Sequence, residues 1–256
     1  MAKNKKPVEK EEEVKIETTE MVDEAETVDI TPEQFQELVS GGNSVSTFSY
    51  GLAESMFMED IDNRIFYIDG EINEDIFREI NVFIMKINAA DAGLSKEERL
   101  PIKIVISSGG GNVLDGIGTI NCIKNSTTQI IAICTSYACS MAFYIFASAH
   151  IRIATADTVF LNHDGTTGIL DSTSKTEDTI EFYKKIHNRL HKMVASRSKL
   201  TMKELSDTKR IENYYFGDEA KDLGLVDMLI GQDVTFEDIF AVYDDCTCDC
   251  EECQMS

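Results

Sequence analysis

The middle of the chain alternates short apolar runs with stretches of helical periodicity. Three runs have the length and composition of buried strands: 65–70 (IFYIDG), 100–107 (LPIKIVIS) and 129–136 (QIIAICTS). Between the first two, apolar residues recur at the spacing of one helix face: Ile76, Ile80, Phe83, Ile84 and Ile87. A further helical stretch, 116–125, precedes the third run. This order predicts an α/β domain with a largely parallel sheet.

The pattern continues in the second half of the chain. We expect a helix over 137–149, two short strands within 151–165 and a short helix over 218–224. A longer helix over 173–197 carries its apolar residues on one face: Ile180, Tyr183, Ile186, Leu190 and Val194. Right-handed crossovers place the loops that follow parallel strands along one edge of the sheet. Active sites in such folds lie at that edge, so the loops there are the first place to look for chemistry.

The two ends of the chain differ from this body in charge. Residues 1–30 carry ten acids against five bases, and residues 233–256 carry eight acids and no base, so together they account for −13 of the formal charge of −22. We expect a disordered acidic extension over 1–30 and a disordered, acidic, cysteine-rich tail over 233–256. A short capped helix and a linker are expected over 31–63, and the folded domain over 64–232.

Composition narrows the classes of function. Clustered Lys and Arg, which a nucleic-acid backbone or an anionic membrane surface would require, are missing. The N-terminal sequence MAKNKKPVEKEEE has no apolar segment of the kind that secretory signals carry, so we expect a cytoplasmic protein. The seven cysteines should then be reduced thiols. Neither GxGxxG nor GxxxxGK[ST] is present, and no cofactor is expected.

Two loops that follow predicted strands have unusual sequences. SSGGGN (107–112) contains three consecutive glycines, whose amides could face an oxyanion, although such a triplet is also typical of a plain turn. In SYACSMA (136–142), Ser140 lies in a strand-to-helix turn between small residues, a position that exposes a nucleophilic hydroxyl. Ser140 could equally cap or pack a helix. His163, in VFLNHDG, could be a base or a satisfied turn residue.

Taken together, these segments resemble one family closely. From Arg64 to Ile230 the chain is similar to the proteolytic subunit of the ATP-dependent Clp protease, which has a crotonase-like α/β fold. SSGGGN resembles that family's SPGG loop, with Gly109 where proline is usual, and SYACSMA resembles its nucleophile segment. The helix at 173–197 is similar to its protruding handle helix, and DEAKDLGLVD (218–227) to its closing motif.

The resemblance implies roles for individual residues. Ser140 would be the nucleophile and His163 the general base, with the amides of Gly111 and Met141 forming the oxyanion hole. The family's acidic residue falls on Glu212, where aspartate is usual, and a glutamate can orient a histidine in the same way. Two aspartates compete for this role: Asp207 and Asp218.

The resemblance also implies partners. The substrates would be polypeptides, the subunits would form stacked homo-oligomeric rings, and a hexameric Clp ATPase would supply unfolded chains. Three alternatives stay open: a phage head-maturation protease of the same fold, an inactive ring subunit, and a crotonase acting on acyl-CoA thioesters. The last would not need a serine and a histidine at these strand ends.

Other reactive side chains are weaker candidates for catalysis or metal binding. Cys139 adjoins Ser140, but neighbouring side chains in such a turn point in different directions. His187 and His191 have a zinc-compatible spacing without an HExxH pattern, and are expected on a solvated or interface face. The tail could bind a soft metal through four thiolates, although exposed free thiols are the preferred interpretation: Cys246, Cys248, Cys250 and Cys253. We therefore expect no metal site.

Overall fold

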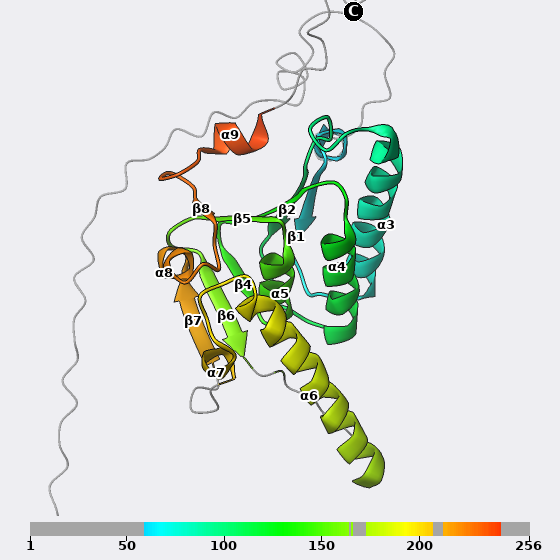
Figure 1. Ribbon diagram of the computed structural model, residues 1–256, viewed down its shortest axis with the longest axis vertical. Coiled ribbons are helices and arrows are strands. Elements are labelled where there is room, and N and C mark those ends of the chain that lie inside the picture. The colour runs from blue at the N-terminus through cyan, green and yellow to red at the C-terminus, as the bar shows by residue number, and fades with distance from the viewer. Residues whose placement is uncertain (1–58, 164, 166–172, 207–211, 242–256) are drawn as a thin grey trace, which may run out of the picture. The chain divides into compact units, whose positions relative to one another are not determined.

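The computed structural model describes residues 59–163, 165, 173–206 and 212–241 (Figure 1). All of them lie in the second of the chain's two structural units, Tyr50–Ser256. The predictions for residues 1–58 and 242–256, which include the capped helix and the four clustered cysteines, lie outside the described residues.

A five-stranded parallel sheet forms the centre of the domain. Its strands, in spatial order, are β1 (Ile65–Ile68), β2 (Ile102–Ile106), β3 (Ile130–Cys134), β5 (Ile151–Ala154) and β8 (Met228–Leu229). The predicted α/β fold class is therefore confirmed, and the three apolar runs that predicted strands form β1, β2 and β3.

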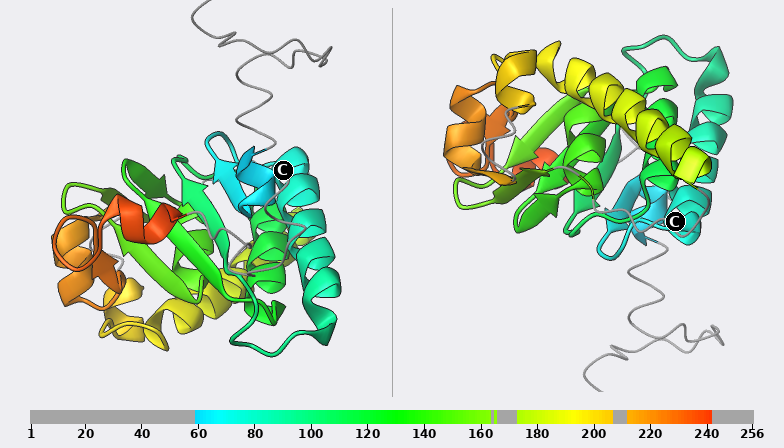
Figure 2. Two further views of the ribbon diagram at one scale, coloured as in Figure 1. Left: turned by 90° about the horizontal axis from the view of Figure 1, so that it is seen from above. Right: turned by 90° about the horizontal axis from the view of Figure 1, so that it is seen from below.

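Helices cover one face of this sheet (Figures 1 and 2). They are α3 (Glu74–Ala90), α4 (Val113–Asn125) and α5 (Met141–Ser148). Asn73 caps α3 by accepting the amides of Asp75 and Ile76, and the helix buries the apolar face that its periodicity predicts. Every residue of α5 is buried, because this helix lies in the centre of the hydrophobic core.

A second sheet of three strands packs against the same core. Its strands are β4 (Tyr137–Cys139), β6 (Val159–His163) and β7 (Glu212–Phe216), with β4 parallel and β7 antiparallel to β6. The ring of Phe160 on β6 lies 4.7 Å from that of Phe146 on α5, so α5 is enclosed between the two sheets. The helix expected over 137–149 is wrong for its first three residues, because they pair with β6 and the helix starts only at Met141.

The predicted long helix is α6 (Thr173–Ala195). Its C-terminal half buries Ile186, Leu190 and Val194 against the core, whereas Ile180 and Phe182 near its other end are exposed. That end extends past the sheets in Figure 1. Two short helices complete this region: α7 (Met202–Leu205) and α8 (Gly217–Asp222).

The opposite face of the main sheet is covered by α9 (Phe236–Phe240). Ile239 is buried there against Ile133 and Ile153, and the Lys103 ammonium lies 6.0 Å from the centre of the Phe240 ring. Disorder was expected from residue 233 onward. For residues 233–241 this expectation is corrected, because the acidic sequence also carries an apolar face that the sheet buries.

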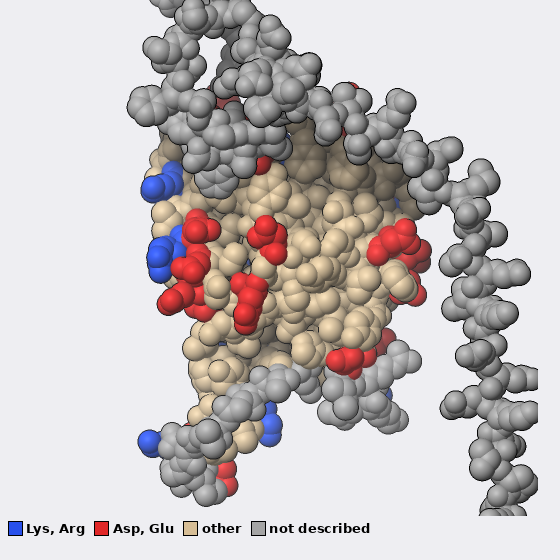
Figure 3. Space-filling model, turned by 180° about the vertical axis from the view of Figure 1, so that it is seen from behind, with Lys and Arg blue, Asp and Glu red and all other residues tan. Residues whose placement is uncertain are grey.

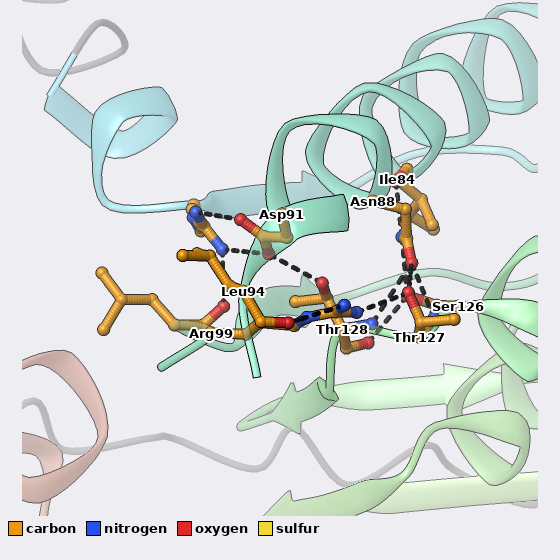
Figure 4. Close-up of polar contacts among 10 residues, drawn as sticks. Ile84, Asn88, Asp91, Leu94, Arg99, Ser126, Thr127 and Thr128 are labelled. Carbon is orange, nitrogen blue, oxygen red and sulfur yellow. Dashed lines mark hydrogen bonds and ion pairs between the residues drawn. The ribbon is translucent and has the colours of Figure 1, made fainter. Parts of the chain in front are cut away.

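A network of polar side chains connects the amino-terminal ends of the strands of the main sheet to the neighbouring helices (Figure 4). Asp91, in the 3-10 turn η1 (Asp91–Gly93) after α3, is buried and accepts two hydrogen bonds of 2.8 Å from the guanidinium of Arg64. It also accepts a 2.7 Å bond from the hydroxyl of Thr128. Asn88 binds the neighbouring residues Ser126 and Thr127. The network joins the starts of three strands to the ends of two helices.

The surface agrees with the charge of the sequence. In the face that Figure 3 shows, acidic side chains are spread widely, and Lys and Arg lie only near its edges. Among the described residues, no helix is long and apolar enough to cross a membrane.

Candidate active site

The glycine triplet forms a loop held on both sides by backbone hydrogen bonds. On one side, the Cys139 amide on β4 donates to the carbonyl of Ser108. On the other, the Ile72 amide donates to the carbonyl of Gly110 at 2.8 Å, and the Asn112 amide to the carbonyl of Ile72 at 2.7 Å. The loop therefore has one fixed position between β4 and the segment that precedes α3.

Two of the three glycines are required by this position. Gly110 and Gly111 have φ values of +102° and +150°, which L-residues rarely adopt. A β-carbon on Gly111 would lie 2.4 Å from the carbonyl oxygen of Ile72, and one on Gly110 would lie 2.6 Å from the Cβ of Ser140. Gly109 has neither constraint, because a β-carbon there meets open space. The loop thus brings its backbone directly against the Ser140 turn.

Ser140 lies in a strained strand-to-helix turn between β4 and α5. Its φ of +54° and ψ of −123° lie outside the regions that L-residues favour. Its amide donates a 2.8 Å hydrogen bond to the carbonyl of Leu161 on β6, and its carbonyl accepts from Phe143. Strained turns of this kind present a nucleophile at the top of a sheet, in front of the N-terminus of a helix.

The amide of Met141, the first residue of α5, lies next to the glycine loop. A β-carbon on Gly110 would be 3.0 Å from that nitrogen. The structure thus places Gly110 against Ser140 and Met141, the residues predicted for the nucleophile and for one amide of the oxyanion hole. Gly111, predicted for the other amide, is the next residue of the loop and packs against Ile72. Backbone amides at a helix N-terminus stabilise negative charge that develops nearby.

His163 is the last residue of β6 and is half-buried. Because β4 and β6 are parallel, with Cys139 paired to Leu161, both strands end at the same edge. The adjacent Asn162 is buried and accepts a 2.6 Å hydrogen bond from the Tyr144 hydroxyl on α5, which fastens the end of β6 to the core. The Ser140 amide bonds to the carbonyl of Leu161, so His163 lies two residues further along β6 from that contact.

Glu212 lies directly opposite His163 in the antiparallel pairing of β6 and β7. Directly opposite residues share one face of a sheet, with Cβ atoms about 4.5–5.5 Å apart. Glu212 is exposed, and its carboxylate accepts a 3.0 Å hydrogen bond from the hydroxyl of Tyr214.

The competing aspartates differ in position. Asp218 lies beyond the other end of β7, where its amide donates to the carbonyl of Ala156. Phe216 pairs with Val159, four residues from His163, which is about 13 Å along the strand. This separation argues against Asp218 as the partner of His163. Asp207 lies outside the described residues.

The thiol next to the candidate nucleophile is poorly suited to catalysis. Burial raises the pKa of Cys139, and a backbone hydrogen bond with Leu161 offsets this only in part. Burial also raises the pKa of Cys134, to about 12. A thiol with a raised pKa holds little thiolate at neutral pH, and the thiolate is the nucleophilic form.

In the histidine pair on α6, His191 packs inside the fold. His191 is buried, lies 3.2 Å from the Ser206 hydroxyl and packs near the Tyr144 ring. The expectation that this pair faces solvent or an interface is therefore wrong for His191, which turns inward because α6 lies on the core at that point. Within the described ranges, no cluster of three His, Cys, Asp or Glu side chains could hold a metal.

Comparison with known proteins decides the family. A model of the Clp protease family matches residues 50–233, which is more than half of the chain. The chain belongs to the Clp protease family. It is also 23% identical over 168 residues to an ATP-dependent Clp protease proteolytic subunit from Chlorella vulgaris, covering 65% of this chain and 81% of the relative. The family resemblance inferred from the sequence is confirmed, and the protein is a peptidase of the Clp type.

Some residues of this Clp-type site were not singled out by the sequence. Ser108 is fully buried, and its hydroxyl donates to the carbonyl of Gly70 and accepts the amide of Gly110, which ties the glycine loop to the end of β1. Tyr214 was missed as well. The strand β7 was not predicted from the sequence, and within it a separation of two residues places Tyr214 and Glu212 on one face.

Proposed function

We propose that this Clp-type protein is a serine endopeptidase that hydrolyses peptide bonds in unfolded polypeptides through an acyl-enzyme. In this proposal Ser140 is the nucleophile, His163 the general base and Glu212 the residue that orients the histidine. The amides of Gly111 and Met141 form the oxyanion hole.

The proposed reaction has two halves. His163 accepts the hydroxyl proton as the Ser140 Oγ attacks the peptide carbonyl, and the oxyanion is held by the two amides. The carbon–nitrogen bond then breaks, and the proton passes from His163 to the leaving amine. In the second half, water attacks the ester and gives a proton to His163. That proton returns to Oγ as the ester bond breaks, and the acid product then loses its remaining proton to solvent.

The observation that carries the proposal is the conformation of Ser140. A non-glycine residue at a φ of +54° is costly, on the order of 1–3 kcal/mol, and persists only where its surroundings enforce it. Here the Leu161 carbonyl and the closely packed Gly110 enforce it. The three candidate catalytic side chains lie at the ends of neighbouring strands, β4, β6 and β7, where such chemistry is expected.

Hydrolysis of a fluorogenic peptide by the full chain tests the proposal. Ser140→Ala should abolish hydrolysis, and His163→Ala should reduce it about as much, because the two side chains act as a unit. Ser136→Ala is the control, since Ser136 is an exposed serine near the same turn whose hydroxyl pairs only with Ser107 among the contacts described. Equal hydrolysis by the wild type and Ser140→Ala would contradict the proposal and favour an inactive subunit.

The assembly is part of the same proposal. We infer a homo-oligomer of stacked rings in the cytoplasm, in which the exposed end of α6 contributes to the contact between rings and a hexameric ATPase delivers substrate. The Chlorella vulgaris relative is named as the subunit of an ATP-dependent protease, which supports this inference. Degradation of a folded protein that requires both an added Clp ATPase and ATP would support it, whereas degradation without either would favour a self-contained protease.

A further inference from the structure

The hydroxyl of Tyr214 donates a 3.0 Å hydrogen bond to the carboxylate of Glu212. The two residues are separated by one position on β7, so their side chains leave the same face of the strand. Both are exposed, and Tyr214 keeps 58% of its surface accessible. Tyr214 therefore gains little from burial, and its hydrogen bond is its most specific contact in the structure.

The register of the second sheet places this pair beside the catalytic candidates. Glu212 is opposite His163, and Tyr214 is opposite Leu161, whose carbonyl accepts the Ser140 amide. Alternate residues of β6 share a face, so Tyr214 lies in the row of the sheet directly next to that of His163 and Glu212.

The chemistry of a carboxylate allows both contacts at once. An ionised carboxylate has two oxygens and about four acceptor positions. Tyr214 occupies Oε2 of Glu212, which leaves Oε1 for an imidazole N–H of His163. A glutamate side chain has three rotatable bonds, so an exposed one is poorly fixed unless a second group holds it. The tyrosine hydroxyl supplies that second contact.

The electrostatics of Tyr214 agree with a bond to a charged carboxylate. The hydrogen bond to Glu212 raises the pKa of Tyr214, with smaller contributions from partial burial and from the negative charge of Glu212. The phenol therefore stays protonated and remains a donor throughout the pH range in which a histidine can act as a base.

We propose that Tyr214 is a positioning residue, which holds the Glu212 carboxylate in the orientation that the His163 imidazole requires. This inference rests on the proposed serine mechanism and adds a fourth side chain to it. Tyr214 does not contact the substrate or the reacting atoms in this role; it acts through Glu212. Its loss should therefore lower the rate of the chemical steps and leave peptide binding unchanged.

The test compares Tyr214→Phe with Tyr137→Phe in the full chain. Tyr137 is an exposed tyrosine on the same sheet face, paired with Val159 two rows away from His163, so it controls for the loss of a surface hydroxyl. The measurements are kcat and KM for a fluorogenic peptide and the rate at which a fluorophosphonate labels Ser140. Thermal unfolding of both variants checks that the fold is retained.

We expect Tyr214→Phe to lower kcat and the labelling rate about three- to tenfold, the range for one ordinary hydrogen bond, because this bond is exposed to solvent, with KM unchanged. Tyr137→Phe should match the wild type. The carboxylate of Glu212→Asp is one methylene shorter and should not reach the tyrosine hydroxyl, so Tyr214→Phe should change the labelling rate less than twofold in that background. This loss of effect would show that Tyr214 acts through Glu212.

Three results would overturn the inference. The first is a wild-type kcat in Tyr214→Phe, and the second is an equal loss of activity in Tyr137→Phe. The third is a three- to tenfold fall in the labelling rate when Tyr214→Phe is added to Glu212→Asp. Each would show that the hydroxyl does not act through Glu212. A wild-type protein that neither hydrolyses peptide nor reacts with the probe would instead overturn the serine mechanism itself. The two failures are therefore distinguishable.

Discussion

Gly110 and Ser140 are in such close contact that a single methyl group would not fit between them. A β-carbon on Gly110 would lie 2.6 Å from the Cβ of Ser140 and 2.8 Å from the carbonyl oxygen of Cys139. The third nearest atom is the backbone nitrogen of Met141, so two of the three neighbours of this β-carbon are backbone atoms. Backbone atoms cannot move aside as a flexible side chain can. The glycine loop and the Ser140 turn are thus fixed relative to each other.

This contact predicts different outcomes for two neighbouring glycines. Gly110→Ala must displace the Ser140 turn, and a displacement of about 1 Å at a reacting group can cost about 10²-fold in rate. Gly109→Ala should retain wild-type hydrolysis and unfold at the same or a slightly higher temperature, because its β-carbon meets open space. Peptide hydrolysis and thermal unfolding of the two variants check this. Equal activity in both would mean that the close contact does not position the nucleophile.

The strand register favours Glu212 as the acid of the proposed triad. Glu212→Gln removes the charge opposite His163, and we expect kcat to fall by about 10²–10⁴-fold, as for other triads that lose their carboxylate. Asp218→Asn is the matched control and should stay within twofold of the wild type, since Asp218 lies at the far end of β7. Steady-state kinetics decide between them. A large loss in Asp218→Asn with full activity in Glu212→Gln would reverse the assignment.

The Arg64–Asp91 pair at the opposite edge of the sheet predicts a stability effect without an active-site effect. The Asp91 side chain is 2% exposed, and Asp91→Asn leaves the Arg64 charge without its partner, at a cost of about 3 kcal/mol of unfolding free energy. The exposed pair of Arg78 and Asp75 is the control, and Asp75→Asn should cost less than about 1 kcal/mol. Urea unfolding measures both. Equal costs would show that the network of Figure 4 contributes little.

The same pair predicts a dependence of stability on pH. Burial would raise the pKa of Asp91, but hydrogen bonds from Arg64 and Thr128 and the charges of Arg64 and Arg99 outweigh it, so the pKa lies below its ordinary value. The contribution of Asp91 is thus complete above about pH 5, well above the unfolded-state pKa, and is lost as the pH falls through the folded-state pKa. In acid titrations followed by urea unfolding, the wild type should lose more stability between about pH 5 and 2 than Asp91→Asn. Parallel curves would contradict this.

The fold was largely predictable because its strands and helices carry strong periodic patterns. The apolar runs at 65–70, 100–107 and 129–136 became strands, and the isoleucines of α3 became its buried face. The segment before Ser140 was harder to predict, because YAC (137–139) is too short to show a hydrophobic period. It forms β4 only because β6 pairs with it.

The chemistry of the site was predictable only in part. The residue types pointed to Ser140 and His163 as candidates, whereas the packing of Gly110 on the Ser140 turn joins segments thirty residues apart, which no local pattern reveals. The position of Tyr214 next to His163 and Glu212 depends on the pairing register of β6 and β7. The helix α9 was not predicted, because the segment around it is rich in acidic residues and such a composition indicates disorder. One buried isoleucine has little influence on the mean hydropathy of that segment.

The raised thiol pKa values of Cys134 and Cys139 predict slow alkylation of both side chains. Iodoacetamide should modify Cys139 and Cys134 in the folded protein at pH 7.5 far more slowly than in urea, because little thiolate is present and access is restricted. Cys139→Ala should keep hydrolysis within about threefold of the wild type, since only a small, half-buried side chain changes. Peptide mapping and kinetics check both. An inactive but folded Cys139→Ala, with rapid modification of the native thiol, would instead indicate a cysteine nucleophile.

The central claim is that the strained turn at Ser140 carries an activated hydroxyl. The most direct test treats the folded, full-length protein with a fluorophosphonate and locates the adduct by peptide mass mapping. We predict one adduct per chain, on Ser140, that forms slowly in His163→Ala and is absent from Ser140→Ala. Undiminished labelling of Ser140→Ala, or no labelling of a wild type that hydrolyses peptides, would contradict the account.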